Sequence, residues 1–342
     1  MRIIPFSEVN RYELFTLLRT CLGEKETIKR DELFWSWKHE QNPFGSSLVL
    51  FGKEGDQLVG VRAFLRWNWQ SNGRFYKALR AVDTVTHPDH QRKGIFSKLT
   101  STALEKAKEE GIDFLYNTPN QNSMPGYLKM GWQEVGLLPM FIKVLEPISF
   151  AARLAKNIML KKEGRIDVTR IISDLPYAGP WLTENARAIE RLIDIDSNMD
   201  GRGLTTVRSL DYLLWRYSSH PYINYHVVEA RVDGELRGVI FCRANQRRGL
   251  REVMVNELLL SSPDIKLVQV LTKMLSSSVH ADYLIAHFGS ASEHLPLLRK
   301  CGFHQISYTG MNFTVRDLGK TIVPDPLVIR NWSLCLGDLE IF

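Results

Sequence analysis

The chain is poor in the features that mark secreted and membrane-spanning proteins. Its 342 residues contain only four cysteines, Cys21, Cys242, Cys301 and Cys335, which lie far apart and form no Cys-x-x-Cys pair. This spacing argues against a disulfide scaffold and predicts reduced, mostly buried thiols. No apolar run approaches the ~20 residues that a membrane-spanning helix needs. The first seven residues lack the apolar core of a signal peptide, so we expect a cytoplasmic protein without stable membrane insertion.

A strong charge of either sign is also missing. Lys and Arg number 44 against 38 Asp and Glu, which gives a formal net charge of +6. The basic residues are scattered, whereas a nucleic-acid-binding surface gathers them in a stripe with stacking aromatics, so we expect no nucleic-acid partner. A slightly basic surface suits an anionic cofactor. The length and an ordinary 44% content of hydrophobic residues leave room for two domains of normal size.

The most informative segment is a strand, a turn and a helix in direct succession. A β-branched run over Thr84, Val85 and Thr86 leads through His-Pro-Asp into residues 91–96, and an amphipathic helix follows as far as Gly111. Apolar residues recur in that helix at three- and four-residue steps, as they do on one buried helix face. Backbone N–H groups at the start of such a helix, with basic side chains beside them, favour binding of a pyrophosphate.

Two segments resemble one known family. The first comprises Gln91, Arg92, Lys93, Gly94, Ile95 and Phe96. It is similar to the acyl-CoA-binding motif of the GNAT acetyltransferases, Gln/Arg-x-x-Gly-x-Gly/Ala, except that Phe96 stands where the family has Gly or Ala. Residues 120–132 are similar to that family's pattern Asn-x-x-Ala-x-x-x-Tyr-x-Lys-x-Gly-Phe at every spacing, with Ser123 and Trp132 as mild substitutions.

This resemblance implies an N-acetyltransferase that moves an acetyl group from acetyl-CoA to a primary amine and uses no metal. It implies that Tyr127 is the general acid and that Asp83, on the strand before the turn, is the general base. An alternative role for Asp83 is to orient the amine or to pair with a basic neighbour. The residues implied to bind the cofactor are Thr84, Val85, Thr86, Gln91, Arg92, Lys93, Gly94, Ile95, Phe96, Asn120 and Ser123.

The second half of the chain repeats patterns of the first. Residues 31–37 are matched by 211–217, the turn at 55–61 by 233–239, and residues 129–132 by 300–303. Ordered matches of this kind indicate a tandem duplication. The second copy has no glycine after Pro263 to match Gly94, and no tyrosine to match Tyr127. We therefore expect it to keep the fold without binding CoA and to shape the acceptor cleft.

The predicted fold is α/β, with two tandem GNAT-like domains that each have a mixed, mainly antiparallel sheet flanked by helices. We expect an N-terminal domain over residues 1–146, a connecting helix within 147–164 and a degenerate C-terminal domain over 165–342. The helical stretch over residues 148–160 is apolar on most of its circumference, so we expect it to pack across both domains. An alternative for this helix is to lie on a membrane surface.

The sequence leaves the acceptor amine unidentified. Trp35, Trp37, Trp67 and Trp69 would suit an aromatic-lined cleft for an amino sugar, or they belong to the core. Two other functions stay open. One is a tRNA-dependent aminoacyl transferase of the kind that builds cell-wall cross-bridges, which is disfavoured because those enzymes generally lose the CoA turn. The other is a non-catalytic acyl-CoA-binding module.

Overall fold

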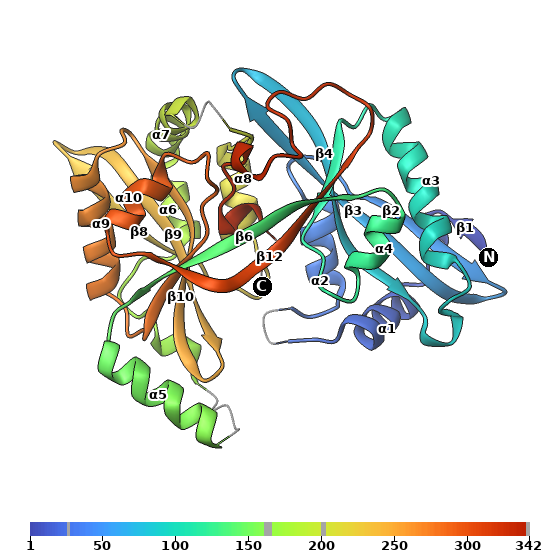
Figure 1. Cartoon of the computed structure of the whole chain (residues 1–342), viewed down its shortest axis with the longest axis horizontal. Helices are drawn as coiled ribbons and strands as arrows, with labels where there is room; N and C mark the ends of the chain where they lie inside the picture. The colour runs from blue at the N-terminus through green and yellow to red at the C-terminus, as the bar shows by residue number, and fades with distance from the viewer. Residues whose placement is uncertain (26–27, 161–165, 200–202, 340–342) are drawn as a thin grey trace.

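The chain forms strands and helices along almost its whole length (Figure 1). The computed structural model describes residues 1–25, 28–160, 166–199 and 203–339. The strands are β1 (Arg2–Ile4), β2 (Leu48–Glu54), β3 (Gln57–Ser71), β4 (Arg74–Thr86), β5 (Phe114–Asn117), β6 (Gln133–Val144), β7 (Thr205–Thr206), β8 (His226–Val232), β9 (Glu235–Arg247), β10 (Leu250–Leu260), β11 (Tyr283–Ala286) and β12 (His304–Asp317). The α-helices are α1 (Arg11–Leu22), α2 (Glu32–Trp35), α3 (Ile95–Glu109), α4 (Met124–Lys129), α5 (Pro147–Leu160), α6 (Ala178–Glu184), α7 (Ala186–Met199), α8 (Leu210–Leu213), α9 (Ile265–Ser277) and α10 (His294–Lys300).

A single β-sheet runs through the molecule. Its strands are hydrogen-bonded in the order β1-β2-β3-β4-β5-β12-β6-β11-β10-β9-β8, and the short β7 pairs with β3. The β4–β5 and β10–β11 pairs are parallel. The other pairs are antiparallel. The prediction of a mixed, mainly antiparallel sheet flanked by helices is therefore confirmed.

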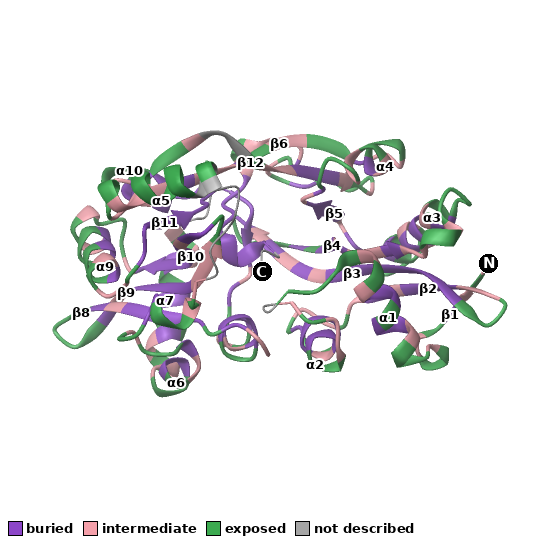
Figure 2. Cartoon of the chain, turned by 90° about the horizontal axis from the view of Figure 1, so that it is seen from below, coloured by how far each residue is buried: buried purple, intermediate pink, exposed green. Residues whose placement is uncertain are grey.

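Strands of the first half bury side chains on both faces, so helices cover both. Val59 of β3 belongs to the same buried cluster as Leu99 of α3, whereas the adjacent Leu58 belongs to the cluster around Leu14 of α1. Successive side chains of a strand point to opposite faces, which explains this division. Figure 2 shows α1 and α3 on opposite sides of β2, β3 and β4.

The two halves of the chain exchange one strand each. Strand β12 of the second half pairs with β5, where Thr314 lies opposite Asn117. Strand β6 of the first half pairs with β11, where Val144 lies opposite Tyr283. The two exchanged strands also pair with each other, and Figure 1 shows them side by side as they cross between the halves. The boundaries expected near residues 146 and 165 therefore do not separate two independent sheets.

The order of elements repeats, with one correction to the sequence match. In each half a short helix, a π-helical turn, three antiparallel strands, a helix, a strand, a helix and a long strand follow one another. The π-helical turns are Ser36–Glu40 and Leu214–Ser218. The preceding helices are capped by Asp31 in the first half and by Ser209 in the second. The sequence match of Asp31 with Asp211 is therefore two residues out of register, and Trp37 corresponds to Trp215.

The two π-helical turns meet in the middle of the molecule. The indole Nε1 of Trp37 donates a hydrogen bond to the carbonyl oxygen of Trp215, and the indole of Trp215 donates to the carbonyl oxygen of Trp37, each at 2.8 Å. The two rings are stacked with their centroids 5.1 Å apart. Reciprocal contacts between equivalent residues are typical of a two-fold axis, so the halves face each other in a nearly symmetric way.

The connecting helix is present as α5, but the expectation that both halves cover it is wrong. Its side chains Ile148 and Met159 are 89% and 82% exposed. Near its start, Phe150 packs on the ring of Tyr283, at a centroid distance of 5.7 Å. Figure 1 shows the helix projecting from the second half. Residues 161–164, where the connection was expected to break, lie outside the described residues.

Two expectations about side chains and spans have a direct outcome. All four cysteines are free, and Cys242, Cys301 and Cys335 are buried, as predicted. Among the described residues, the helices are too short or too polar for any of them to cross a membrane.

Candidate acyl-CoA site

The predicted phosphate-binding turn joins β4 to α3. Strand β4 ends at Thr86, a 3-10 turn over Pro88–His90 follows, and α3 begins at Ile95. Gly94 precedes the helix with a φ of 74°, a left-handed conformation that glycine adopts without steric cost. The buried side chains Ile95 and Leu99 fix the helix on the sheet. The strand, turn and helix therefore stand as the sequence predicts.

The N-terminus of α3 is open, whereas that of the equivalent helix α9 is closed. No side chain of the described residues caps α3. In α9 the carboxylate of Asp264 accepts a hydrogen bond from the N–H of Lys266 at 2.8 Å. Free N–H groups and the helix dipole attract an anion, and a carboxylate already at that place repels one. The first half therefore leaves room for an anion at a position where the second half already places a carboxylate.

A pocket of about 500 Å³ lies at the open turn. Most of the residues predicted for the site line it, namely Thr84, Val85, Thr86, Gln91, Arg92, Gly94, Ile95, Phe96, Ser123 and Tyr127. Ser97, Asn122 and Gly126 line it as well. These three were missed because they occupy variable positions in or beside the two motifs. Lys93, Asn120 and Asp83 are not among the lining residues.

Asn120 stabilises the loop that builds one wall of this pocket. Its Oδ1 accepts hydrogen bonds from the N–H groups of Asn122 and Ser123, at 3.0 and 2.9 Å. This is the hydrogen bonding of an Asx turn, in which a side chain replaces a backbone partner. The turn leads into α4 and so places Tyr127 at the pocket. A contact between Asn120 and the cofactor stays a prediction.

Tyr127 lies beside the aromatic residue that departs from the family motif. Its ring meets Phe96 edge-on at a centroid distance of 5.8 Å and Trp132 at 5.2 Å. Phe96 also lies over Gly126, where an added Cβ would stand 3.3 Å from the Phe96 ring. The glycine in α4 therefore leaves room for the large side chain on α3, and Phe96 forms part of the pocket wall.

A β-bulge in β4 separates the two neighbours Asp83 and Thr84. The pairing between β3 and β4 shifts by one residue at this point, so that both residues lie opposite Arg62. Asp83 has a φ of 36°, which is unusual for a residue other than glycine. Thr84 lines the pocket and accepts a hydrogen bond from Arg62. Asp83 makes its contacts elsewhere.

Asp83 lies in a buried cluster of basic groups. Its carboxylate accepts hydrogen bonds from Lys38, from His39 Nε2 at 3.0 Å and from Arg30 Nη1 at 3.0 Å. Burial alone raises the pKa of Asp83, but Lys38, His39 and Arg30 outweigh burial and hold that pKa well below its usual range. A carboxylate stabilised so strongly as an anion is a weak base. The geometry therefore favours the alternative role of pairing with basic neighbours, and the general base stays unassigned.

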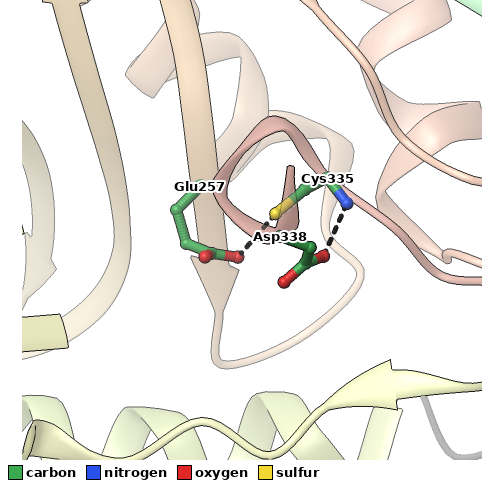
Figure 3. Close-up of side chains that lie close together, drawn as sticks. All are labelled: Glu257, Cys335 and Asp338. Carbon is green, nitrogen blue, oxygen red and sulfur yellow. Dashed lines mark hydrogen bonds between the residues drawn. The ribbon is translucent and has the colours of Figure 1, made fainter. Parts of the chain in front are cut away.

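The second half has an equivalent cluster around the buried carboxylate of Glu257. Glu257 accepts hydrogen bonds from Arg208 at 2.9 Å and from Tyr217 at 3.0 Å, and these two residues correspond to Arg30 and His39 in the repeat. Figure 3 shows Cys335 and Asp338 beside it. The thiol of Cys335 lies 3.2 Å from Glu257, and the Asp338 carboxylate accepts a hydrogen bond from the Cys335 N–H at 2.7 Å.

The three side chains in Figure 3 are of metal-ligating types, and one donor atom from each lies within 4.8 Å of the others. Their surroundings fit a hydrogen-bonded cluster better than a metal site. Both oxygens of the Glu257 carboxylate already accept hydrogen bonds, one from Arg208 and one from Tyr217. A metal requires the thiolate, whereas burial, with Asp338 and Glu257 nearby, raises the pKa of Cys335 well above its usual range. The cluster therefore holds residues 335–338 against Glu257 of β10.

The tryptophans considered for an acceptor cleft belong to the core. Trp35, Trp37 and Trp67 are 3% exposed and Trp69 is 0% exposed. Trp37 and Trp67 border a pocket of only about 10 Å³, which is too small for a sugar ring. The expectation of an aromatic-lined cleft for an amino sugar is therefore wrong for these residues, and the core alternative is confirmed.

Comparison with known proteins agrees with this geometry. Residues 2–135 match the family model described as an acetyltransferase (GNAT) domain. No curated protein matches the chain. A GCN5-related N-acetyltransferase from Anabaena variabilis is similar in structure, with a TM-score of 0.64, 13% identity, and coverage of 92% of this chain and 72% of that chain. A protein of unknown function from Enterococcus faecalis, described as a probable N-acyltransferase, has a TM-score of 0.62, 13% identity, and coverage of 93% and 72%.

N-myristoyltransferase from Saccharomyces cerevisiae, solved with bound myristoyl-CoA, is also similar, with a TM-score of 0.55, 11% identity, and coverage of 92% of this chain and 82% of that chain. At these identities the structural likeness shows the fold alone, and it extends over both halves. The family match adds chemistry, because it covers the turn, the pocket and α4, and it supports acyl transfer from an acyl-CoA. Residues 2–135, which match this family model, therefore form a GNAT acetyltransferase domain.

Proposed function

We propose that the protein transfers an acetyl group from acetyl-CoA to a primary amine of a small molecule, and that the first half alone binds the cofactor. The observation that carries this proposal is the pocket at the uncapped N-terminus of α3. Its turn has free N–H groups and Arg92 for a diphosphate, and Tyr127 lies in the same pocket. The capped helix α9 supports the view that the second half keeps the fold without the cofactor.

The chemistry asked of this site is modest. The amine nitrogen attacks the thioester carbonyl, and holding both reactants in one site supplies much of the rate. The sulfur then leaves and takes a proton from Tyr127, whose oxygen accepts a hydrogen bond from Arg62 at 2.9 Å. The Tyr127 proton is thereby left to point away from Arg62. The large Phe96 side chain in the pocket wall favours a short acyl group such as acetyl.

Two other functions predict different results in the experiment described below. An aminoacyl transferase that uses tRNA would release an amino acid from aminoacyl-tRNA and would not need acetyl-CoA. A non-catalytic module would bind acetyl-CoA and release no thiol with any amine. The intact turn and pocket favour an enzyme that uses acetyl-CoA over the first alternative, and the placement of Tyr127 in the pocket favours it over the second.

The experiment combines calorimetry with a thiol-release assay on a panel of primary amines and acyl-CoAs of increasing chain length. We expect one molecule of acetyl-CoA per chain and fastest release with the acetyl thioester. Gly94→Glu should weaken acetyl-CoA binding by more than roughly tenfold, because its carboxylate would stand where the diphosphate is expected.

Gly73→Glu is the matched control. Gly73 has a φ of 73° and, like Gly94, nothing within 4 Å of an added Cβ, but it lies in the turn between β3 and β4. It therefore reports the backbone strain of the substitution without the charge at the pocket. Equal acetyl-CoA affinity of the two variants, or two bound molecules per chain, would overturn the proposed site.

A further inference from the structure

Arg62 is a buried cation with no carboxylate partner among the described residues. Its side chain is 0% exposed. Its Nη1 donates hydrogen bonds to the hydroxyl groups of Thr84 and Tyr127. Its Nε and Nη2 are buried and have no hydrogen-bond partner in the described part of the chain. A guanidinium carries its charge at any physiological pH, so this charge lies uncompensated directly behind the pocket wall.

Aromatic rings surround this guanidinium in place of anions. Its central carbon lies 4.2 Å from the centroid of Phe64, 5.2 Å from that of Tyr127 and 5.3 Å from that of Phe96. Burial lowers the pKa of Arg62, and Tyr127 is the neighbour that opposes this change. Ring faces attract a cation, but they do not neutralise it. Phe96, the residue that departs from the family motif, forms one side of this cage.

An unpaired buried charge destabilises a fold, so its presence indicates a role other than stability. The charge of Arg62 is offset as soon as negative charge appears next to it. The proposed reaction generates such a charge, since the sulfur of CoA departs with an electron pair and Tyr127 becomes anionic when it gives up its proton. Fixed dipoles and charges that face developing charge are the strongest single contribution in many enzymes.

We propose that Arg62 is a positioning residue that acts through Tyr127, directing the tyrosine proton to the leaving sulfur and stabilising the negative charge that develops on the tyrosine oxygen and the sulfur. This inference rests on the proposed function. In the step itself, the C–N bond forms, the C–S bond breaks, and the electron pair of that bond goes to sulfur. The proton of Tyr127 moves to sulfur. The proton that the amine releases goes to water, and water returns a proton to Tyr127.

The first test is a cycle of variants assayed with acetyl-CoA and the best amine of the panel. We expect Arg62→Met to lower kcat by roughly 10²-fold and Tyr127→Phe by ~10²–10⁴-fold, with the KM for acetyl-CoA nearly unchanged. The double variant should be no slower than Tyr127→Phe alone, because Arg62 acts through that hydroxyl. Arg62→Lys keeps the charge and should recover part of kcat. Independent, multiplying effects in the double variant would overturn the proposal.

The second test measures stability, which separates a functional charge from a structural one. Arg62→Met removes an uncompensated buried charge, so we expect its melting temperature to equal or exceed that of the wild type. Arg66→Met is the matched control on the same strand. Arg66 is partly exposed and pairs with Glu110 at 2.6 Å outside the pocket, so its loss should leave kcat unchanged. A clear loss of stability in Arg62→Met with unchanged kcat would show a merely structural residue.

The third test needs no acceptor and therefore separates this inference from the proposed function. Near pH 9.5 a sizeable fraction of the CoA thiol is ionised, and its thiolate imitates the developing charge. We expect the wild type to prefer CoA over acetyl-CoA at that pH, and Arg62→Met to lose at least roughly tenfold of that preference. If the wild type acetylates no amine but shows this preference, the proposed function fails and the role of Arg62 stands. If Arg62→Met keeps the preference, the role of Arg62 fails.

Discussion

At the scale of single residues, the bulge in β4 decides what Asp83 does. It places Thr84 at the pocket and lets Asp83 reach Lys38, His39 and Arg30. Neighbours in sequence thus take part in two different structures. The sequence predicts Asp83 as the general base because its strand leads into the turn. The distinction between a base and a buried ion-pair partner depends on Lys38 and Arg30, which are 45 and 53 residues away in the chain.

We predict that Asp83→Asn destabilises the protein more than it affects the chemical step. Removing one partner of a buried ion pair typically costs about 3–5 kcal/mol, because the other charge stays buried. The folded-state pKa of Asp83 is lowered, so the stability it contributes is present above the unfolded pKa of about 3.9 and is lost as the pH falls through the folded pKa. Urea unfolding should show a large difference from the wild type at pH 7 that shrinks below about pH 4.

Asp89→Asn is the control for this measurement, since the side chain of Asp89 is 86% exposed and its loss should change the free energy of unfolding little. One result would contradict this prediction and support Asp83 as the general base. In that case the Asp83→Asn variant would be as stable as the wild type and inactive at neutral pH, and its activity would return at higher pH, where more of the amine is deprotonated.

At the scale of elements, the two π-helical turns explain how the halves hold together. Trp37 and Trp215 each donate to the carbonyl oxygen of the other, and each ring covers the other. Each turn therefore receives a hydrogen bond from the other half. Helix α5, in contrast, joins the halves covalently while its side chains Ile148 and Met159 stay exposed. The central turns therefore stabilise the interface more than the connecting helix does.

We predict that Trp37→Phe and Trp215→Phe each lower the free energy of unfolding by about 1–3 kcal/mol beyond the loss of packing, because each removes an indole N–H that donates to a carbonyl of the opposite turn. The two effects should not add in the double variant, since both residues belong to one contact. Urea unfolding checks this, with Trp181→Phe as the control. Trp181 is 6% exposed and its indole N–H has no partner among the described residues, so that variant loses packing alone. Additive effects of Trp37 and Trp215 would contradict the shared contact.

At the scale of the whole molecule, the strand exchange makes the two halves depend on each other. Strand β12 separates β5 from β6, and β6 separates β12 from β11. Neither half has a complete sheet without the strand of the other. The pocket that we propose for the cofactor lies in the first half, but α4 and its Tyr127 follow β5, whose outer neighbour comes from residues 314–317.

We predict that the full chain unfolds in one cooperative transition and that residues 1–146 alone do not bind acetyl-CoA. The fragment lacks β12, so β5 would expose an unpaired edge and α4 would lose its support. Co-expression with residues 147–342 should restore binding, which calorimetry of the purified pair measures. A soluble, monomeric fragment with the affinity of the full chain, or two separate thermal transitions, would show that the halves are independent.

The sequence alone determined the parts of the site that depend on neighbouring residues. Gly94 allows the left-handed turn before α3, and the spacing of Asn120, Ser123 and Tyr127 fixes the loop and helix that face it. The hairpin turn at Asp233 and Gly234 is local in the same way, with both residues at positive φ. Such features follow from backbone conformations over a few residues, so a single sequence carries them.

Only the tertiary structure decided which distant side chains meet. Arg62 reaches Tyr127 across 65 residues, and Trp37 reaches Trp215 across 178. Strands β6 and β12 are also far apart in the sequence, and the residues of neither strand indicate which strand it pairs with. A charge or a ring has no partner until the sheet brings one beside it, because burial and Coulomb energy depend on distances in space. The local sequence therefore determined the turn before α3, whereas the fold decided which side chains Asp83 and Arg62 contact.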